Sequence, residues 1–251
     1  MEERLNKWLS QMGVCSRREA DRLIEAGKVL VDNRPASMGQ KVTPGQKVVC
    51  NGKMVRVDRS QRPRPVLLAV NKPKGVVCTT TDKDRAENIV DFLGYPERIY
   101  PVGRLDKDSE GLLLMTNQGD LVNKIMRSGN AHEKEYIVTI DKPVTEHFLE
   151  QMAGGIRLPE LDQVTRPCKV KKVERNTFSI ILTQGLNRQI RRMCEVCGCQ
   201  VRRLVRVRIM NIRLGNLRTG AYRQITKEEY EELTGLLKDS SSLSLKERKN
   251  R

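Results

Sequence analysis

The chain has 251 residues and a formal net charge of +16, from 47 lysines and arginines against 31 aspartates and glutamates. Its length allows one large domain or two smaller ones, and 38% hydrophobic residues are enough for a globular core. So large a positive surplus favours a polyanionic partner, because basic side chains neutralise phosphates and release counterions. Seven cysteines without a signal peptide indicate reduced thiols. No apolar stretch approaches the roughly 20 residues of a membrane span, so we expect a soluble, cytoplasmic protein that binds no membrane.

Residues 1–58 are predicted to form a small basic unit of two helices followed by a small sheet. Apolar residues recur at helical spacing over residues 5–12. Ser16 and Glu19 form a capping box, which indicates a second helix that runs to about Ala26. Short apolar runs bounded by turn residues then predict strands at 29–31, 47–50 and 54–57.

This order of elements, over about the first quarter of the chain, resembles the S4 RNA-binding domain. The resemblance is carried by residues 4–7, 27–29 and 44–45. A solvated charged face is the alternative explanation for the basic strip on the second helix. The resemblance implies that five basic side chains face RNA phosphates: Arg4, Lys7, Arg17, Arg18 and Arg22.

The rest of the chain is predicted to be a linker, a larger domain and a tail. Residues 59–65 are polar and punctuated by proline, which is typical of a linker. Residues 66–238 are strand-rich with interspersed helices, which predicts an α+β domain on a mixed, mainly antiparallel sheet. Residues 239–251 are expected to be a disordered basic tail. Within the larger domain we expect strands at 66–70, 98–102, 112–115, 135–140 and 177–182, and helices at 120–126 and 187–196.

A charged loop at residues 103–111 joins two of these predicted strands. Asp106 and Asp108 supply carboxylates, and Arg104 supplies a nearby cation. A carboxylate beside a guanidinium stays ionised and keeps one orientation, which suits a nucleophile or an electrostatic stabiliser. A surface turn held by salt bridges is the alternative. Of the two carboxylates, Asp106 is the predicted catalytic group.

Two further segments carry candidate side chains. Tyr136 begins a predicted strand, where its ring can stack on a base and its hydroxyl can move a proton; an ordinary strand aromatic is the alternative. Arg188, Arg191 and Arg192 lie near a helix start, which favours phosphate or a catalytic carboxylate; a plain basic helix is the alternative. The three cysteines within 194–199 include one CxxC, but no second one follows and the histidines are distant, so no metal site is predicted.

Together these segments are far more specific than any one alone. The chain resembles the RNA pseudouridine synthases, and within them the RsuA/RluB/RluE/RluF branch, which carries an S4 domain ahead of the catalytic domain. The sequences of residues 129–136, 184–187 and 208–211 are most similar to those of a branch member that modifies large-subunit ribosomal RNA. The segments that match the family in order and spacing are 71–75, 103–113, 134–136 and 187–191.

The resemblance implies a role for several of these residues. Asp106 matches the catalytic nucleophile of the family, whereas Asp108 is not at the matching position. Tyr136 matches the tyrosine that stacks on the target base and is proposed to move a proton. Arg191 matches the arginine that pairs with the aspartate. Two more positions match residues that line the cleft, Lys72 and Arg104.

The reaction that the resemblance implies is isomerisation of a uridine to pseudouridine. The target base is flipped out of the RNA, the N1–C1′ bond breaks, the base turns, and C5 joins C1′. An ionised carboxylate assists by adding to the sugar, by adding to the base, or by taking a sugar proton, and the sequence leaves these routes open. The isomerisation is not a redox reaction and needs no nucleotide energy. No P-loop or dinucleotide-binding pattern is present, so no cofactor is expected.

The expected substrate is a uridine in 23S ribosomal RNA or in a large-subunit precursor, acted on by a monomer. The nearer alternative is the same chemistry on 16S ribosomal RNA or on transfer RNA. The alternative from another class is a non-catalytic RNA-binding or ribosome-assembly protein that uses the S4 unit.

Overall fold

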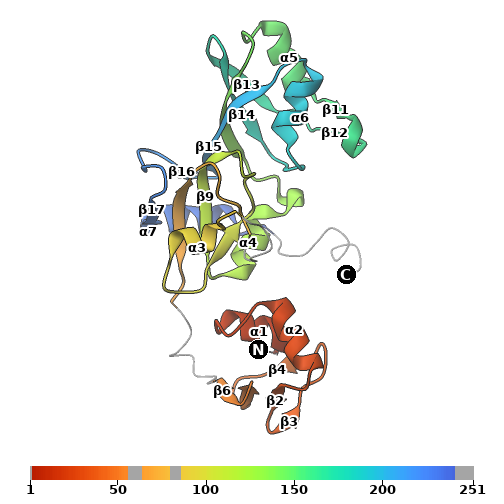
Figure 1. Ribbon diagram of the computed structural model, residues 1–251, viewed down its shortest axis with the longest axis vertical. Coiled ribbons are helices and arrows are strands. Elements are labelled where there is room, and N and C mark those ends of the chain that lie inside the picture. Colours follow the sequence, from red (N-terminus) through yellow and green to blue (C-terminus); the bar gives the residue numbers. More distant parts are fainter. Residues whose placement is uncertain (1, 56–63, 80–85, 241–251) are drawn as a thin grey trace. The chain divides into compact units, whose positions relative to one another are not determined.

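The computed structural model describes residues 2–55, 64–79 and 86–240. The chain divides into two compact units, the first containing Met1–Pro65 and the second containing most of the chain from Val66 onward (Figure 1). Most of the predicted linker, residues 59–63, and most of the predicted tail, residues 241–251, lie outside the described residues. The predicted domain limits therefore remain a prediction.

The first unit has two helices packed on a small antiparallel sheet, in the order β3-β2-β5-β6. Helix α2 begins where the sequence predicts, because the Ser16 hydroxyl accepts a hydrogen bond from the Glu19 backbone N–H at 3.1 Å. Leu5, Trp8 and Ile24 are among the apolar side chains that form its buried core. The elements are β1 (Glu3–Arg4), α1 (Leu5–Gln11), α2 (Arg17–Glu25), β2 (Val29–Val31), β3 (Arg34–Pro35), β4 (Lys41–Val42), β5 (Val48–Cys50) and β6 (Lys53–Val55).

The second unit is built on a nine-stranded sheet whose main path runs β13-β14-β10-β15-β9-β7-β17, with β8 paired to β9 and β16 paired to β15. Every pairing in this sheet is antiparallel except the one between β15 and β9. The predicted α+β class with a mixed, mainly antiparallel sheet is confirmed. The strands are β7 (Leu67–Lys72), β8 (Tyr100–Val102), β9 (Glu110–Thr116), β10 (Lys134–Ile140), β13 (Lys169–Glu174), β14 (Thr177–Leu182), β15 (Val201–Ile209), β16 (Ile212–Arg213) and β17 (Tyr222–Gln224).

Helices cover the two halves of this sheet differently. Helices α5 and α6 lie at one end of the unit beside β13 and β14, and α3, α4 and α7 lie at the other end (Figure 1). A short hairpin, β11 (Arg157–Leu158) with β12 (Gln163–Val164), lies beside α6. No helix in the part of the chain that the structure describes is long and apolar enough to cross a membrane. The helices are α3 (Ile89–Leu93), α4 (Gly119–Met126), α5 (Glu146–Gly154), α6 (Gln189–Val196) and α7 (Lys227–Leu236).

The parallel pairing of β15 with β9 brings the two halves of the sheet together. Val205 pairs with Glu110 and Arg206 pairs with Gly111. Gly111 has φ 102°, and a Cβ at this position would lie 2.4 Å from the Arg206 carbonyl oxygen. Only glycine fits so close a backbone approach at a positive φ. This glycine therefore holds the charged loop that precedes β9 against β15.

The structure differs from the predicted elements at several points, including the two that follow. The helix predicted at 120–126 begins one residue earlier, at Gly119, so Asp120 lies in its first turn. An acidic residue in the first turn still interacts favourably with the helix dipole. Strand β15 has no counterpart among the predicted elements, because its alternating valines and arginines resemble an exposed basic segment.

Candidate active site

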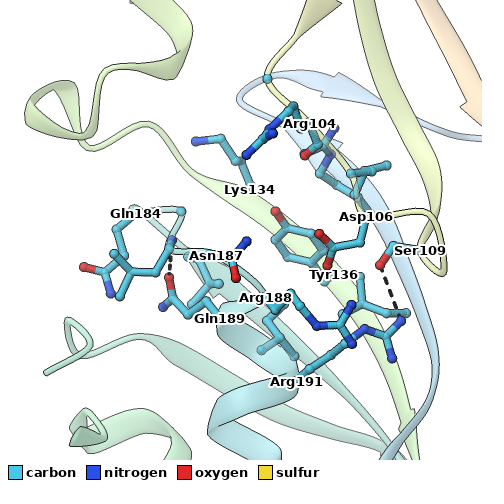
Figure 2. Close-up of a pocket in the computed structure, with 18 of the residues that line it drawn as sticks. Arg104, Asp106, Ser109, Lys134, Tyr136, Gln184, Asn187, Arg188, Gln189 and Arg191 are labelled. Atoms are coloured by element: carbon cyan, nitrogen blue, oxygen red, sulfur yellow. Dashed lines mark hydrogen bonds between the residues drawn. The ribbon is translucent and has the colours of Figure 1, made fainter. Parts of the chain in front are cut away.

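A cavity of about 550 Å³ opens between the charged loop, the strands β10 and β15, and the start of α6. Asp106 and Tyr136 lie at its centre, with Arg104 and Lys134 on one side and Arg188 and Arg191 on the other (Figure 2). The structure thus gathers side chains that the sequence places far apart into one concave site, the kind of site that binds small ligands and substrate groups.

The loop of residues 103–109 is fixed from beneath by hydrogen bonds. The Ser109 N–H donates to the Asp106 carbonyl at 3.0 Å, and the Gly75 N–H donates to the Lys107 carbonyl at 2.9 Å. Lys72 is completely buried, and its ammonium donates to the Ser109 carbonyl at 2.9 Å. These contacts hold Asp106, which is half-buried, with its side chain on the cavity.

The position of Lys72 differs from the one that the resemblance implies. Its side chain has no exposed surface and is not among the residues that line the cavity. Its second hydrogen bond goes to the Pro73 carbonyl at 2.7 Å. Burial lowers the pKa of this lysine. Lys72 therefore supports the loop of residues 103–109 instead of facing the cleft.

Tyr136 belongs to β10, one of the central strands of the sheet. Its neighbours across the sheet are Ile180 on β14 and Arg206 on β15. Its ring packs against the apolar clusters of both halves of the unit, and its free edge faces the cavity. A ring held in this way offers a flat, rigid surface on which a base can stack.

Arg191 reaches the loop of residues 103–109 but does not pair with Asp106 in this structure. Its guanidinium donates to the Asp108 carbonyl at 3.1 Å, to the Ser109 hydroxyl at 3.5 Å and to the Val201 carbonyl at 3.4 Å. None of the ion pairs between described residues joins it to Asp106. The expected arginine–aspartate pair is thus replaced by contacts with the loop backbone just after the aspartate.

The remaining arginines of the predicted set have different environments. Arg104 and Arg188 are exposed at the cavity, and Arg188 lies 3.8 Å from the Asp108 carboxylate. Arg192 donates to the Asn187 carbonyl at 3.0 Å and pairs with Glu160. It does not line the cavity.

In the first unit, the predicted RNA-facing cations lie on α1, α2 and the residue before α1. Arg4, Arg17 and Arg18 are exposed. Lys7 is half-buried and pairs with Glu3 at 3.1 Å, and Arg22 is exposed and pairs with Glu19 at 3.4 Å. An exposed pair such as the one between Arg22 and Glu19 contributes little to stability.

Two buried cations at the cavity were missed as candidates by the sequence analysis. Lys134 is 5% exposed and Arg206 is 1% exposed, and both line the cavity. Burial, reinforced by repulsion from Arg206, lowers the pKa of Lys134 to about 8. Lys134 was within reach of sequence reasoning because strand alternation places it on the same face as Tyr136. Arg206 was not, because nothing in the sequence separates it from its neighbouring arginines.

The comparisons with known proteins agree with this arrangement. The profile of a family described as RNA pseudouridylate synthase matches residues 66–196, and that of the S4 domain matches residues 3–48. The chain is 52% identical over 239 residues to the dual-specificity RNA pseudouridine synthase RluF of Escherichia coli K12, covering 95% of this chain and 81% of that protein. It is 36% identical over 242 residues to the ribosomal large subunit pseudouridine synthase B of Bacillus subtilis, covering 93% and 96%.

A solved structure is also similar. A crystal structure of a pseudouridylate synthase matches with a TM-score of 0.67 and 27% identity, covering 92% of this chain and 99% of that one. The alignments extend over almost the whole chain and include both units. This protein therefore belongs to the RNA pseudouridylate synthase family, and it is an enzyme that isomerises uridine in RNA.

Proposed function

We propose that the enzyme converts a specific uridine of 23S ribosomal RNA to pseudouridine in the cavity described above. The observation that carries the proposal is that the Asp106 carboxylate and the Tyr136 ring line one cavity that also carries several cations. A flipped uridine needs an aromatic surface for its base, and its sugar needs a carboxylate within reach. The name of the Bacillus subtilis relative, which refers to the ribosomal large subunit, supports this choice of RNA.

Each candidate residue has a proposed role in this reaction. Asp106 is the carboxylate that assists cleavage of the N1–C1′ bond. Tyr136 stacks on the target base, which recovers part of the few kcal/mol that flipping the base costs. Arg191 holds the loop after Asp106 in place through the Asp108 carbonyl. Two exposed arginines at the cavity, Arg104 and Arg188, contact RNA phosphates.

We also propose that residues 1–58 act as an S4 RNA-binding domain and residues 66–238 as the catalytic domain. The five basic residues of the first unit contribute affinity by neutralising phosphates. Such contacts do not depend directly on the RNA sequence. The proposed enzyme is a monomer in the cytoplasm. Light scattering of the purified protein and fractionation of the cells that make it test these two points.

The test of the proposal is genetic. The gene is deleted, pseudouridines are mapped by chemical labelling across all stable RNAs, and the strain is complemented with the wild type, Asp106→Asn or Asp108→Asn. We expect one 23S uridine to lose its modification, and the wild type and Asp108→Asn to restore it. Asp106→Asn is expected to restore nothing, because an amide cannot replace the ionised carboxylate.

Other results of this experiment would change either the assigned catalytic residue or the assigned substrate. Restoration by Asp106→Asn would show that another group does the chemistry. Loss of a site in 16S ribosomal RNA or in transfer RNA would change the substrate and keep the reaction. The name of the Escherichia coli relative includes "dual-specificity", so the mapping covers transfer RNA as well as both ribosomal RNAs.

A further inference from the structure

Lys134 and Arg206 form a pair of buried cations at the wall of the cavity. Arg206 on β15 is the direct cross-strand neighbour of Tyr136, and Lys134 lies two residues before Tyr136 on β10. Residues two apart on a strand share a face, and directly opposed residues have their Cβ atoms about 5 Å apart. The two cations therefore lie next to the ring on which the target base is proposed to stack, and all three residues line the cavity.

Among the described residues, the hydrogen bonds of this pair go to backbone carbonyls and not to carboxylates. Arg206 donates from Nε to the Leu112 carbonyl at 2.7 Å and from Nη1 to the Arg104 carbonyl at 3.4 Å. Its buried Nη2 has no hydrogen-bond partner among the described residues. Lys134 donates to the His132 carbonyl at 3.2 Å. Within residues 2–55, 64–79 and 86–240, no ion pair involves either side chain.

Two neighbouring buried cations that form no ion pair destabilise the protein when no RNA is bound. Desolvation disfavours each charge, and mutual repulsion adds to the cost. Both effects act on Lys134, whose pKa falls for these two reasons. An orphaned buried donor is also costly unless a ligand supplies its acceptor. The arrangement indicates that an anionic or strongly polar group of the substrate occupies the space between them.

We propose that Lys134 and Arg206 bind the carbonyl oxygens of the target uracil and stabilise the negative charge that the base acquires when its N1–C1′ bond breaks. This assignment rests on the proposed position of the reaction in this cavity. The base is the part of a flipped nucleotide that enters deepest, and both cations are buried. A backbone phosphate stays nearer the mouth, where the exposed Arg104 and Arg188 lie.

The chemistry balances without a co-reactant. When the N1–C1′ bond breaks, its electron pair remains on the uracil and spreads over N1 and the two carbonyl oxygens. Both cations donate hydrogen bonds to these oxygens and keep their own protons. A new electron pair from C5 then forms the C5–C1′ bond, C5 loses its proton, and N1 gains one. The same stabilisation serves every route by which Asp106 can act, since the base becomes electron-rich in each.

Fixed donors aimed at a developing negative charge are most effective in a dry site, because little water screens them and no reorganisation is needed. The pair in this protein meets those conditions. Its guanidinium is held by two carbonyls on neighbouring loops and strands, and its ammonium is almost completely buried. The two residues are thus assigned to the chemical step, not to RNA affinity.

The experiment compares two leaving bases. Single-turnover rates at saturating RNA are measured for the wild type, Lys134→Met and Lys134→Arg, with RNA that carries uridine or 5-fluorouridine at the target. The rate is the disappearance of the intact N-glycoside, followed by nucleoside chromatography, and RNA affinity is measured by filter binding. Fluorine at C5 stabilises the uracil anion, so the enzyme's own stabilisation matters less with this substrate.

With uridine we expect Lys134→Met to lose about 100-fold or more in rate, as when one donor to a developing anion is removed elsewhere. RNA affinity should change by no more than about twofold, since the residue is assigned to the transition state. With 5-fluorouridine the loss should shrink to roughly tenfold or less. Lys134→Arg, which keeps the charge, should recover part of the rate. Lys72→Met is the matched control, because Lys72 is also buried but does not line the cavity; any loss it causes should be equal for the two substrates.

Three results would overturn the inference. Equal losses for the two substrates would assign Lys134 a positioning role. A weakened affinity with an unchanged rate would assign it to a phosphate, and no change would assign it no role. Asp106→Asn, assayed in parallel, separates these failures from failure of the site itself. If that variant were active, another group would do the chemistry, and the proposed function would fail independently of the role of Lys134.

Discussion

Lys134→Met is expected to make the folded protein more stable at neutral pH while it makes the enzyme slower. The pKa of Lys134 falls from 10.5 to about 8 because the ammonium is buried beside Arg206. A pKa that is lower in the folded than in the unfolded protein means that the fold disfavours the charged form. Methionine keeps the unbranched side chain and carries no charge.

The magnitude follows from the pKa. The difference between 10.5 and about 8 is roughly 2.5 pH units, and each unit corresponds to about 1.36 kcal/mol. The buried ammonium therefore lowers the free energy of unfolding by about 3 kcal/mol at any pH below about 8. The variant also loses the hydrogen bond to the His132 carbonyl, which is worth about 1 kcal/mol. We expect a net gain of about 2 kcal/mol in the free energy of unfolding at pH 7.

The effect has a defined pH dependence. Between about pH 8 and 10.5 the unfolded chain binds the Lys134 proton and the folded protein does not. Wild-type stability therefore gains a contribution that rises with pH across this window, and the variant lacks it. Other titrating groups are common to both proteins and cancel in the difference. The advantage of the variant should thus be full at pH 7 and should disappear by about pH 10.5.

The assay is urea unfolding of both proteins at pH 7 and pH 10.5, with the slopes compared so that only stability is scored. A variant that is less stable than the wild type at pH 7 would refute the reasoning. So would a stability difference that is the same at the two pH values. A gain in stability together with a loss in rate is the combination expected of a charge retained for catalysis.

Three further predictions concern other parts of the chain. Gly111→Ala should lower the free energy of unfolding by about 2 kcal/mol or more, because its Cβ would lie 2.4 Å from a backbone oxygen at φ 102°; thermal unfolding checks this, and an unchanged midpoint would contradict it. Arg191→Ala should lower the rate at saturating RNA about 10-fold to 100-fold with RNA affinity nearly unchanged, because it frees the loop after Asp106; a loss confined to affinity would make Arg191 a phosphate contact instead. Removal of residues 1–58 should weaken RNA binding and flatten its salt dependence while the second unit stays folded; equal binding across a salt series would exclude an RNA-binding role for the first unit.

The strands around the loop were predictable because each contains a continuous apolar run, at residues 66–70 and 112–115. In β7 all six residues are buried, and in β9 six of the seven are. Runs of this kind read as buried strands without knowledge of their neighbours. The candidate residues on the loop and on β10 were also predictable, because the order of the motifs along the chain places them at the ends or starts of such strands. Strand β10 was likewise predictable from the local alternation of apolar and polar residues.

The functions of the arginines on β15 were not predictable from local pattern. Arg203 is exposed and pairs with Glu110 at 2.8 Å, whereas Arg206 is completely buried at the cavity. The two residues have the same chemistry and nearly the same sequence context. Their difference arises from the pairing of β15 with β9, which is a contact between segments about ninety residues apart. Single-sequence reasoning has no access to such a pairing.

The position of Arg191 shows a second kind of limit. The sequence resemblance implies an ion pair with Asp106, but the guanidinium lies on the backbone after it. Helix α6 begins at Gln189, after Arg188 in the left-handed conformation. This start sets where the third helical residue points, and a motif cannot specify it. A shift in where this helix begins is therefore enough to move Arg191 from the aspartate side chain to the backbone after it.

The cations of this protein fall into two physical classes, and each class suits a different step. Exposed cations such as Arg17 and Arg18 interact with phosphates through water and ions, and salt screens them over about 10 Å. They are suited to capture and affinity. Lys134 and Arg206 are buried, so mobile ions screen them little, and their cost to the fold is already incurred before RNA arrives. Binding that is equally strong in the ground state and the transition state does not raise the rate. The cost of burying the two cations is therefore useful to the enzyme only if they bind a negative charge that develops on the substrate during the reaction. The electron-rich uracil is the group in this reaction that satisfies that condition.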